Sequence, residues 1–271
     1  MKTLRLLFVT LASLWLAGCG DFGSLADSRI RLVNATTGGY ESLDLYVDGE
    51  REVSGVAAGT VSGWRGVASG SFSVALARPP STTPLAAATR EIRNDTDHTV
   101  VAYGRTGSLK AVMLVEDEPR PASGRARLRV LNAGSDAGAI DVYLTAADEP
   151  LGDASPAAAG VAADDTSDWT TVNVGDFRLR VTGAGDRDDL RLDVGGLRLD
   201  SRQVATLIVT GTTGGVLVDA ALVVQGGALT KLANTSARVR VVAAIAGGAR
   251  VGVRAGDRVL AADAVSPQVG S

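Results

Sequence analysis

The sequence predicts an all-β protein that consists of two tandem antiparallel β-sandwich domains and a partial third unit. First, one pattern of about 100 residues, the size of a small domain, occurs twice in full. Second, short stretches of alternating apolar residues are separated by Gly, Pro, Asn and Asp every 8–12 residues or so, which is typical of a sandwich or barrel. Third, no stretch shows the sustained i, i+3, i+4 apolar spacing of an amphipathic helix.

The repeated pattern has two blocks. The first block joins a strand ending in Asn-Ala to an apolar-Asp-apolar-Tyr strand, and the second runs from Gly-Val-Ala-Ala through a Trp to a Phe. The first block lies at Ile30–Ala35 with Leu43–Val47 and again at Leu128–Ala133 with Ile140–Leu144. The second block lies at Gly55–Phe72 and again at Gly160–Phe177. The offset between the copies grows from 98 to 105 residues, mostly through an insertion at Thr145–Ala159 where the first copy has Asp48–Ser54. Because loops absorb insertions and packed strands do not, both stretches are expected to be loops.

Further strands follow from alternation of apolar and polar residues. Arg29–Ala35 should place Ile30 and Leu32 inward and its arginines outward, and Asp48-Gly49 is a typical hairpin turn after Leu43–Val47. The other strands expected in the first copy are Thr60–Val67, Phe72–Ala77, Ala86–Arg93, Thr99–Gly104 and Leu109–Glu116.

The domain boundaries follow from the repeat and from composition. Glu118–Gly124 contains two prolines, which favour an extended chain, so this segment is expected to be a semi-stiff spacer. The expected segments are a signal peptide at 1–18, a lipidated tether at 19–28, sandwich domains at 29–117 and 125–225 on either side of the 118–124 linker, and a linker with a partial third unit at 226–271.

The leader has the form of a bacterial lipoprotein signal peptide. Lys2 and Arg5 precede an apolar run that is too short to span a bilayer, and the run leads to Leu16-Ala17-Gly18-Cys19. These four residues resemble the lipobox, which implies diacylglycerol on the Cys19 sulfur and acylation of its amine after cleavage. Several acyl chains anchor a protein firmly in a membrane. Gly20, rather than Asp, follows Cys19, which favours the outer membrane within the cell envelope. The alternative is an ordinary signal peptide with a chance Cys.

Charge and composition exclude some function classes. The net charge is −3, and −5 once Lys2 and Arg5 are removed, so clustered basic residues for nucleic-acid phosphates are not expected. Cys19 is the single cysteine, so no intramolecular disulfide can form. His98 is the single histidine, so a metal site with several His or Cys ligands is not expected. No Gly-x-Ser-x-Gly motif surrounds any serine. We therefore expect neither cofactor, nor metal, nor enzymatic activity.

Taken together, the two copies of strand–Asn-Ala, apolar-Asp-apolar-Tyr, Gly-Val-Ala-Ala and the Gly-x-Phe strand resemble the bacterial family called domain of unknown function 4397. The resemblance covers most of residues 29–225 and implies Ig-like sandwiches, often in tandem on exported proteins. The family has no established catalytic residues to carry over, and the truncated third unit departs from its pattern.

Six residues are candidates for a binding surface. Asp44 and Tyr46 alternate with apolar residues, as do Asp141 and Tyr143, so each pair should share the strand face opposite the core. They form either a paired polar surface or a solvent-facing cross-strand pair, with the Tyr hydroxyl able to fix a loop. The other candidates are Trp64 and Trp169. Each lies three residues before a Val, so either a bulge turns both side chains inward or one faces out.

Acidic residues crowd two further places. Asp186, Asp188, Asp189 and Asp193 could offer oxygen ligands to calcium, but the spacing is not that of an EF-hand and Arg187 and Arg191 are interleaved. A solvated hairpin tip is the other interpretation. Asp95 and Asp97 flank His98 in the same ambiguous way.

Three functions remain open. The first is a non-enzymatic envelope lipoprotein that acts as a binding or structural module, with a protein or polysaccharide partner in the envelope. The second is a carbohydrate- or peptidoglycan-associated binding protein in which Trp64 and Trp169 are stacking platforms. The third is an unusual hydrolase that uses Asp and Ser.

Overall fold

A computed structural model of the chain describes residues 28–212, 215–239, 241–245, 247–265 and 268–270. The predicted signal peptide, most of the tether and Cys19 lie outside the described residues. Within the described part of the chain, no helix has the length and apolar character needed to cross a bilayer. The prediction of an all-β protein with sandwich-like units is confirmed, since one short 3-10 turn is the only helical element among the described residues.

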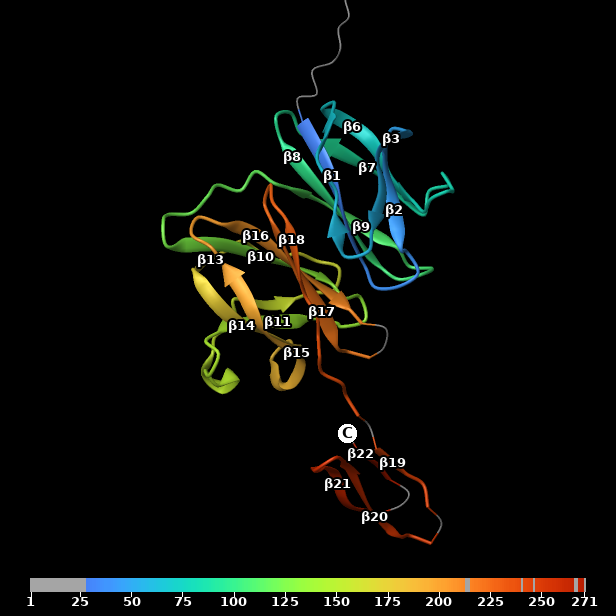
Figure 1. Ribbon diagram of the computed structural model, residues 1–271, viewed down its shortest axis with the longest axis vertical. Coiled ribbons are helices and arrows are strands. Elements are labelled where there is room, and N and C mark those ends of the chain that lie inside the picture. Colours follow the sequence, from blue (N-terminus) through green and yellow to red (C-terminus); the bar gives the residue numbers. More distant parts are fainter. Residues whose placement is uncertain (1–27, 213–214, 240, 246, 266–267, 271) are drawn as a thin grey trace, which may run out of the picture.

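The first sandwich is built from two sheets (Figure 1). Sheet A has the order β4-β1-β8-β9, with β5 also pairing β1, and sheet B has the order β3-β2-β6-β7. The strands are β1 (Ser28–Thr36), β2 (Ser42–Val47), β3 (Glu50–Ala57), β4 (Thr60–Val61), β5 (Arg65–Val67), β6 (Gly70–Ala77), β7 (Ala86–Ile92), β8 (Asp97–Gly104) and β9 (Lys110–Val115). β1 and β8 are parallel, and every other pair is antiparallel. The prediction of antiparallel sandwiches is therefore wrong for this pair, because the chain crosses sheet B and re-enters sheet A beside β1 in the same direction.

Three local features test the strand predictions, and one of them confirms its prediction. Asp48 and Gly49 both have positive φ, 50° and 88°, as the predicted hairpin turn requires. The loop expected at Asp48–Ser54 is wrong, because β3 continues that hairpin from Glu50 and pairs with β2. The single strand expected over Thr60–Val67 is interrupted, and Trp64 lies between the short strands β4 and β5.

The second sandwich repeats this plan. Sheet C has the order β13-β10-β16-β17-β18, and sheet D has the order β12-β11-β14-β15. The elements are β10 (Arg125–Ala133), β11 (Ile140–Thr145), the 3-10 turn η1 (Leu151–Asp153), β12 (Ala158–Val161), β13 (Thr170–Asn173), β14 (Gly175–Gly183), β15 (Asp186–Leu199), β16 (Val204–Gly211), β17 (Val218–Val224) and β18 (Leu229–Leu232). β10 and β16 are parallel, as β1 and β8 are.

Each sandwich has its own core of aliphatic side chains. Ile30, Leu32, Leu43 and Leu45 are fully buried between sheets A and B, and the core between sheets C and D is larger. The inward side chains of β1 are those that the period-2 pattern predicted. With few aromatic residues available, Val, Leu, Ile and Ala supply the buried area.

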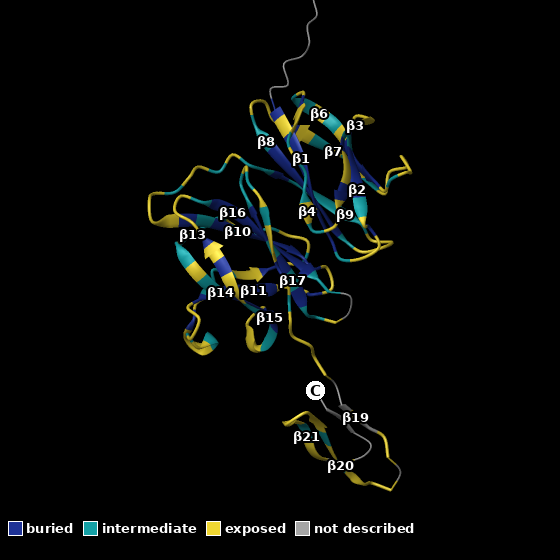
Figure 2. Cartoon of the chain, in the orientation of Figure 1, coloured by how far each residue is buried: buried dark blue, intermediate teal, exposed yellow. Residues whose placement is uncertain are grey.

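A third apolar cluster joins the two sandwiches face to face. It contains residues of β1, β8, β9, β10, β16 and β17 that point away from the cores of their own sandwiches. Val33 and Val101 from sheet A meet Leu131 and Ile208 from sheet C, and all four side chains are fully buried. Figure 2 shows these strands as the buried centre of the two-domain body. We call this cluster, with the polar residues around it, the interdomain interface.

The Glu118–Gly124 segment connects two sandwiches that pack directly on each other, and its stiffness stays a prediction. The two sheets pack directly because each presents an apolar outer face. The segment is itself tied to the second sandwich: Gln225 donates to the Glu118 carbonyl at 3.0 Å, Glu118 pairs with Arg127, and Gly124 donates to Ser201 at 3.0 Å.

The C-terminal unit contains two further strand pairs, β19 (Val241–Ala243) with β22 (Gln268–Gly270) and β20 (Arg250–Ala255) with β21 (Arg258–Val265). The same pairing, first strand with fourth and second with third, occurs at β1–β4 and β2–β3. This unit lies apart from the sandwiches (Figure 1), and Figure 2 shows none of its coloured residues as buried.

We expect protease to cut first in the C-terminal unit. The preceding segment is held, because Asn234 bonds to the carbonyls of Arg191 and Val218 and Arg238 pairs with Asp189. Beyond Arg238 the apolar side chains of Val239, Val242 and Ile245 are more than half exposed, so little burial opposes local opening. Limited digestion with proteinase K, which cuts with little sequence preference, followed by mass spectrometry should show early cleavage after residue 238 and a stable two-sandwich fragment. Earlier cleavage in the 118–124 linker would contradict this.

Candidate functional site

The predicted site residues do not form one surface. Asp44 and Asp141 lie on the outer faces of sheets B and D, as the alternation predicted, but their exposures are only 2% and 6%. Asp44 accepts the Gly55 amide at 2.7 Å, and Asp141 accepts the amides of Gly160 at 2.7 Å and Gly185 at 2.9 Å. The interpretation of a solvent-facing pair is wrong for both aspartates, because each carboxylate satisfies backbone groups at a register shift of its own sheet.

The two tyrosines have different surroundings. Tyr46 is half-buried beside Arg51, its partner in β3. Tyr143 is buried, with Arg187 stacked 5.9 Å from its ring centroid. The inserted segment after β11 folds over this face of sheet D, since arginines 178, 180 and 187 donate to the carbonyls of Ala147, Glu149 and Ala154 at 2.8–3.0 Å.

Trp64 and Trp169 are half-buried, and each lies on an arginine of the interdomain interface. The guanidinium carbon of Arg31 is 4.4 Å from the Trp64 ring centroid, and that of Arg129 is 4.4 Å from the Trp169 ring centroid. Arg29 adds a second contact to Trp64 at 5.2 Å. Cation–π contacts of this length stabilise partly desolvated arginines by about 0.5–2 kcal/mol. One face of each indole is therefore in use within the protein.

Each sandwich has a hollow between its Gly-Val-Ala-Ala strand and the Ser-x-Trp residues that follow that strand in the sequence. The hollow of the first sandwich has a volume of about 470 Å³ and is lined by Trp64, Gly55 and Ser62, among others. Its counterpart beside Gly160 and Ser167 has a volume of about 410 Å³. The two hollows are a duplicated feature of the molecule, at the open edge of each sandwich.

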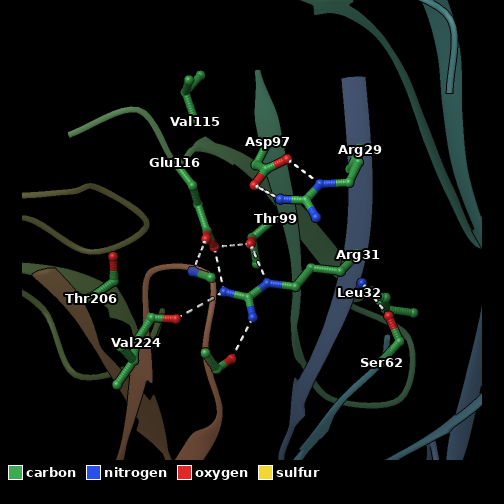
Figure 3. A network of polar contacts seen from close by, with 12 residues as sticks. Arg29, Arg31, Leu32, Ser62, Asp97, Thr99, Val115, Glu116, Thr206 and Val224 are labelled. Atoms are coloured by element: carbon green, nitrogen blue, oxygen red, sulfur yellow. Dashed lines mark hydrogen bonds and ion pairs between the residues drawn. The ribbon is translucent and has the colours of Figure 1, made fainter. Parts of the chain in front are cut away.

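The most extensive polar network surrounds Arg31, whose exposure is 1% (Figure 3). Its Nε donates to Thr99 Oγ1 at 2.8 Å, and its terminal nitrogens donate to Glu116 at 2.5 Å, to the Gly227 carbonyl at 2.5 Å and to the Val224 carbonyl at 3.1 Å. Glu116 also accepts the Gly226 amide at 2.7 Å. An arginine of the first sandwich thus binds the β17–β18 turn of the second, and the ion pair is hydrogen-bonded on both sides.

Arg129 occupies the same position in the second sandwich. Its Nε donates to Thr206 at 2.9 Å, as Arg31 does to Thr99, and it reaches the Val115 carbonyl of the first sandwich at 3.3 Å. Val115 and Val224 end the equivalent strands β9 and β17. The glutamate has no counterpart, since Gln225 stands in its place. Burial lowers the pKa of Arg129, although Glu116, Glu118 and Asp117 partly oppose that effect.

Comparison with known protein families decides the identity of the first sandwich. The family model "Domain of unknown function (DUF4397)" matches residues 28–143, which cover the first sandwich, the linker, β10 and β11 as far as Tyr143. Residues 28–143 contain a DUF4397 domain. The match is narrower than the resemblance over 29–225, and the kinship of the second sandwich to the DUF4397 domain rests on the internal repeat.

Neither curated proteins nor solved structures assign a function to the chain. No curated protein matches the chain. Among solved structures, it is similar to a maltoheptaose complex of the family CBM26 module CBMbc from Eubacterium rectale Amy13K. That likeness has 14% identity and a TM-score of 0.22, and it covers 73% of this chain and 95% of the other. At this TM-score it carries no argument about function.

The asparagines that end the first strand of the DUF4397 domain and of its repeat are structural. Asn34 is fully buried and donates to the Val56 carbonyl at 2.9 Å, while its oxygen accepts from Thr36. Asn132 donates in the same way to the Val161 carbonyl at 3.0 Å. Both asparagines connect the two sheets of a sandwich where the first strand ends.

The acidic clusters bind arginines and backbone groups. Asp189 pairs with Arg191 at 2.6 Å and with Arg238, and Asp193 pairs with Arg178 at 2.6 Å. Burial opposes ionisation of Asp189, but the hydrogen bonds and charges of Arg191 and Arg238 outweigh it and lower the pKa of Asp189 below its usual value. The part of the chain that the structure describes contains no group of three or more His, Cys, Asp or Glu side chains placed to hold a metal ion.

His98 of the DUF4397 domain is fully buried and hydrogen-bonded at both ring nitrogens, 3.3 Å from the Arg93 amide and 3.1 Å from the Thr96 carbonyl. Its ring therefore fixes the β7–β8 turn. Burial lowers the pKa of His98 below its usual value of 6.5, and the carbonyl of Thr96 only partly opposes this.

We expect His98 to make stability depend on pH. The unfolded chain binds a proton near pH 6.5 or so, whereas the folded protein binds it only at lower pH. Stability is therefore fully present above that value and is lost as the pH falls through the folded pKa. Urea unfolding at about pH 7.5 and about pH 5.5 should show this loss, and His98→Gln should reduce it. An unchanged pH dependence in the variant would contradict the assignment.

Proposed function

We propose that this protein is a cell-envelope lipoprotein whose two sandwiches act as a non-enzymatic binding or structural module. The sequence Leu16-Ala17-Gly18-Cys19 supports acyl anchoring at Cys19, and Gly20 after it supports the outer membrane. The finer assignment of the sandwiches as Ig-like is part of this proposal and rests on the family resemblance.

The observation that carries the modular role is the interdomain interface. A buried apolar cluster and a buried Arg31–Glu116 ion pair hold the two sandwiches together as one packed body, rather than as two domains that move independently. A body of this kind can hold a partner at a fixed distance from the membrane. The aspartates that a hydrolase would use are engaged with backbone amides and arginines, which supports a non-enzymatic role.

Anchoring is tested by Cys19→Ser. Membrane fractionation should find the wild-type protein in the membrane pellet, and the variant should be soluble or unprocessed. Gly20→Asp is the matched variant: it keeps the acylated sulfur and, in a cell with two membranes, should move the protein to the inner membrane. Processed Cys19→Ser protein that still sediments with membranes like wild type would refute the lipid anchor.

The partner is sought by affinity capture from detergent-solubilised envelope. Capture with wild type and with Cys19→Ser should return the same protein or polysaccharide, because the proposed contacts lie on the sandwiches. If only the acylated protein captures a protein or polysaccharide, the captured molecules bind through the acyl chains. The sandwiches are then structural spacers.

A second candidate is a carbohydrate- or peptidoglycan-associated binding protein. The observation that favours it is that Trp64 lines a hollow of about 470 Å³. The test is iodide quenching of Trp fluorescence with and without soluble peptidoglycan fragments, alongside Trp64→Phe and Trp169→Phe. Protection of Trp64 by the fragments would support this candidate. Quenching that the fragments do not alter would exclude both indoles as sugar platforms.

A further inference from the structure

The two ends of the interdomain interface differ although the interface has approximate twofold symmetry. Arg31 binds the Val224 carbonyl across the interface, and Arg129 binds the Val115 carbonyl in return. Equivalent residues can therefore be identified from the strand registers. Ala35 pairs with Tyr103 in sheet A, and its counterpart Ala133 pairs with Thr210 in sheet C.

One end of the interface is closed by side chains from both sandwiches. Lys110 binds Asp164 at 2.6 Å and Ser135 at 3.1 Å, and Ser135 binds Asp164 at 2.8 Å. Tyr103 is buried against this group and interacts with Asp164 through its hydroxyl. Burial, with Asp164 adding to it, raises the pKa of Tyr103 to about 12. Burial opposes ionisation of Asp164, but the hydrogen bonds from Lys110, Ser135 and Tyr103 outweigh it and lower the pKa of that carboxyl.

The other end is an open groove of about 480 Å³. All four counterparts of the closing residues line it: Thr210 for Tyr103, Asp219 for Lys110, Gly59 for Asp164, and Thr37 for Ser135. Asp164 and Gly59 have the same backbone conformation, with φ of 65° and 70°. The groove is open where a threonine replaces the phenol ring of the other end, whereas the Lys231 side chain takes up the space over Gly59.

The walls of the groove combine apolar and charged groups. Ala35, Ala221 and Leu229 supply apolar surface, and Thr36 and Tyr40 lie on the first-sandwich side. Two carboxylates, Glu41 and Asp219, face one ammonium, Lys231. Lys231 lies across Gly59 and is 3.5 Å from the Ala58 carbonyl. The charged groups that line the groove therefore carry a net negative charge.

We propose that this groove binds a small ligand built on a hydroxylated aromatic ring that carries an amino group. The ring with its hydroxyl is inferred from the closed end, where the Tyr103 phenol occupies the equivalent space between the same sheets. The amino group is inferred from the excess of carboxylate at the groove, and the volume lies in the range of small-molecule sites. This site deepens the proposed binding role, and it does not involve Cys19.

The probe is tyramine, a phenol with an amine, titrated into the mature two-sandwich protein with p-cresol as the uncharged comparison. Amide resonances of Ala221 and Leu229 should shift on tyramine addition. Thr210→Tyr, which places at the open end the ring that fills the closed end, should weaken binding by about tenfold or more, equivalent to about 1.4 kcal/mol. Glu41→Gln should weaken tyramine and leave p-cresol unchanged.

The urea unfolding midpoint of Thr210→Tyr shows whether that variant folds, and Gly59→Asp tests the same end by an independent change. Tyramine shifts that survive in a folded Thr210→Tyr protein would overturn the site. So would the absence of shifts at Ala221 and Leu229 in wild type at millimolar tyramine. Processed Cys19→Ser protein that still sediments with membranes, with tyramine binding intact, would overturn the lipoprotein proposal alone.

Discussion

Glu116→Ala is expected to lower the free energy of unfolding by about 3–5 kcal/mol, the usual cost of breaking a buried ion pair. The substitution leaves the Arg31 guanidinium, 1% exposed, without its carboxylate inside the interdomain interface. It also removes the acceptor for the Gly226 amide and for the Thr99 hydroxyl. Urea unfolding followed by Trp fluorescence and by far-UV circular dichroism measures the loss.

The matched control replaces the pair instead of breaking it. In Arg31→Met with Glu116→Leu no buried charge is left unpaired, so most of the stability should return. Gln225→Ala, at the equivalent place in the second sandwich, should cost much less, since Gln225 bonds to the Glu118 carbonyl and holds no buried cation. A loss below about 1 kcal/mol in Glu116→Ala would show that the network does not hold the sandwiches together.

Leu131→Ala is expected to cost about 2–5 kcal/mol, because Leu131 is fully buried in the interdomain cluster and its removal leaves a cavity. The informative readout is cooperativity. Wild type should unfold in one transition, whereas weakening the interface should separate the transitions of the two sandwiches or lower the m-value.

Leu85→Ala is the control for this change, since Leu85 is 45% exposed and its truncation should stay within about 0.5 kcal/mol. If Leu131→Ala is equally mild, the sandwiches are independent and the interface contributes little to stability. A large loss with a single, unbroken transition would instead assign Leu131 to the stability of the second sandwich alone.

The strands of each sandwich could be predicted from the sequence, but their association could not. Ile30 and Leu32 face the core as the alternation predicted, and Asp48-Gly49 makes the predicted turn. Arg29 and Arg31 on the outward face of the same strand predict that this face is exposed to solvent. Val33 and Ala35 share that face, and their apolar character was the signal for a second packed surface. A period-2 pattern shows which side is apolar and does not show what covers it.

The candidate site shows the same limit. Asp44 and Asp141 are equivalent in the repeat, but a carboxylate that caps backbone amides within its own sheet has no local pattern that distinguishes it from a surface aspartate. The arginines under the indoles could have been found, because Arg31 and Arg129 also occupy equivalent positions in the two copies. Glu116 could not, since its partner lies 85 residues away and the second copy has a glutamine there.

The parallel pairing of β1 with β8 has a consequence for the order in which the chain can fold. β1 cannot complete sheet A until β8 is available, and the Arg29–Asp97 bond closes a loop of 68 residues. The Arg31–Gly227 bond spans 196 residues, so the interdomain interface forms only after the second sandwich is largely complete. Non-local pairings of this kind slow folding, because the entropy of loop closure is lost before the contacts form. Until then the apolar outer face of β1 is uncovered, which leaves a period in which it can bind chaperones or aggregate.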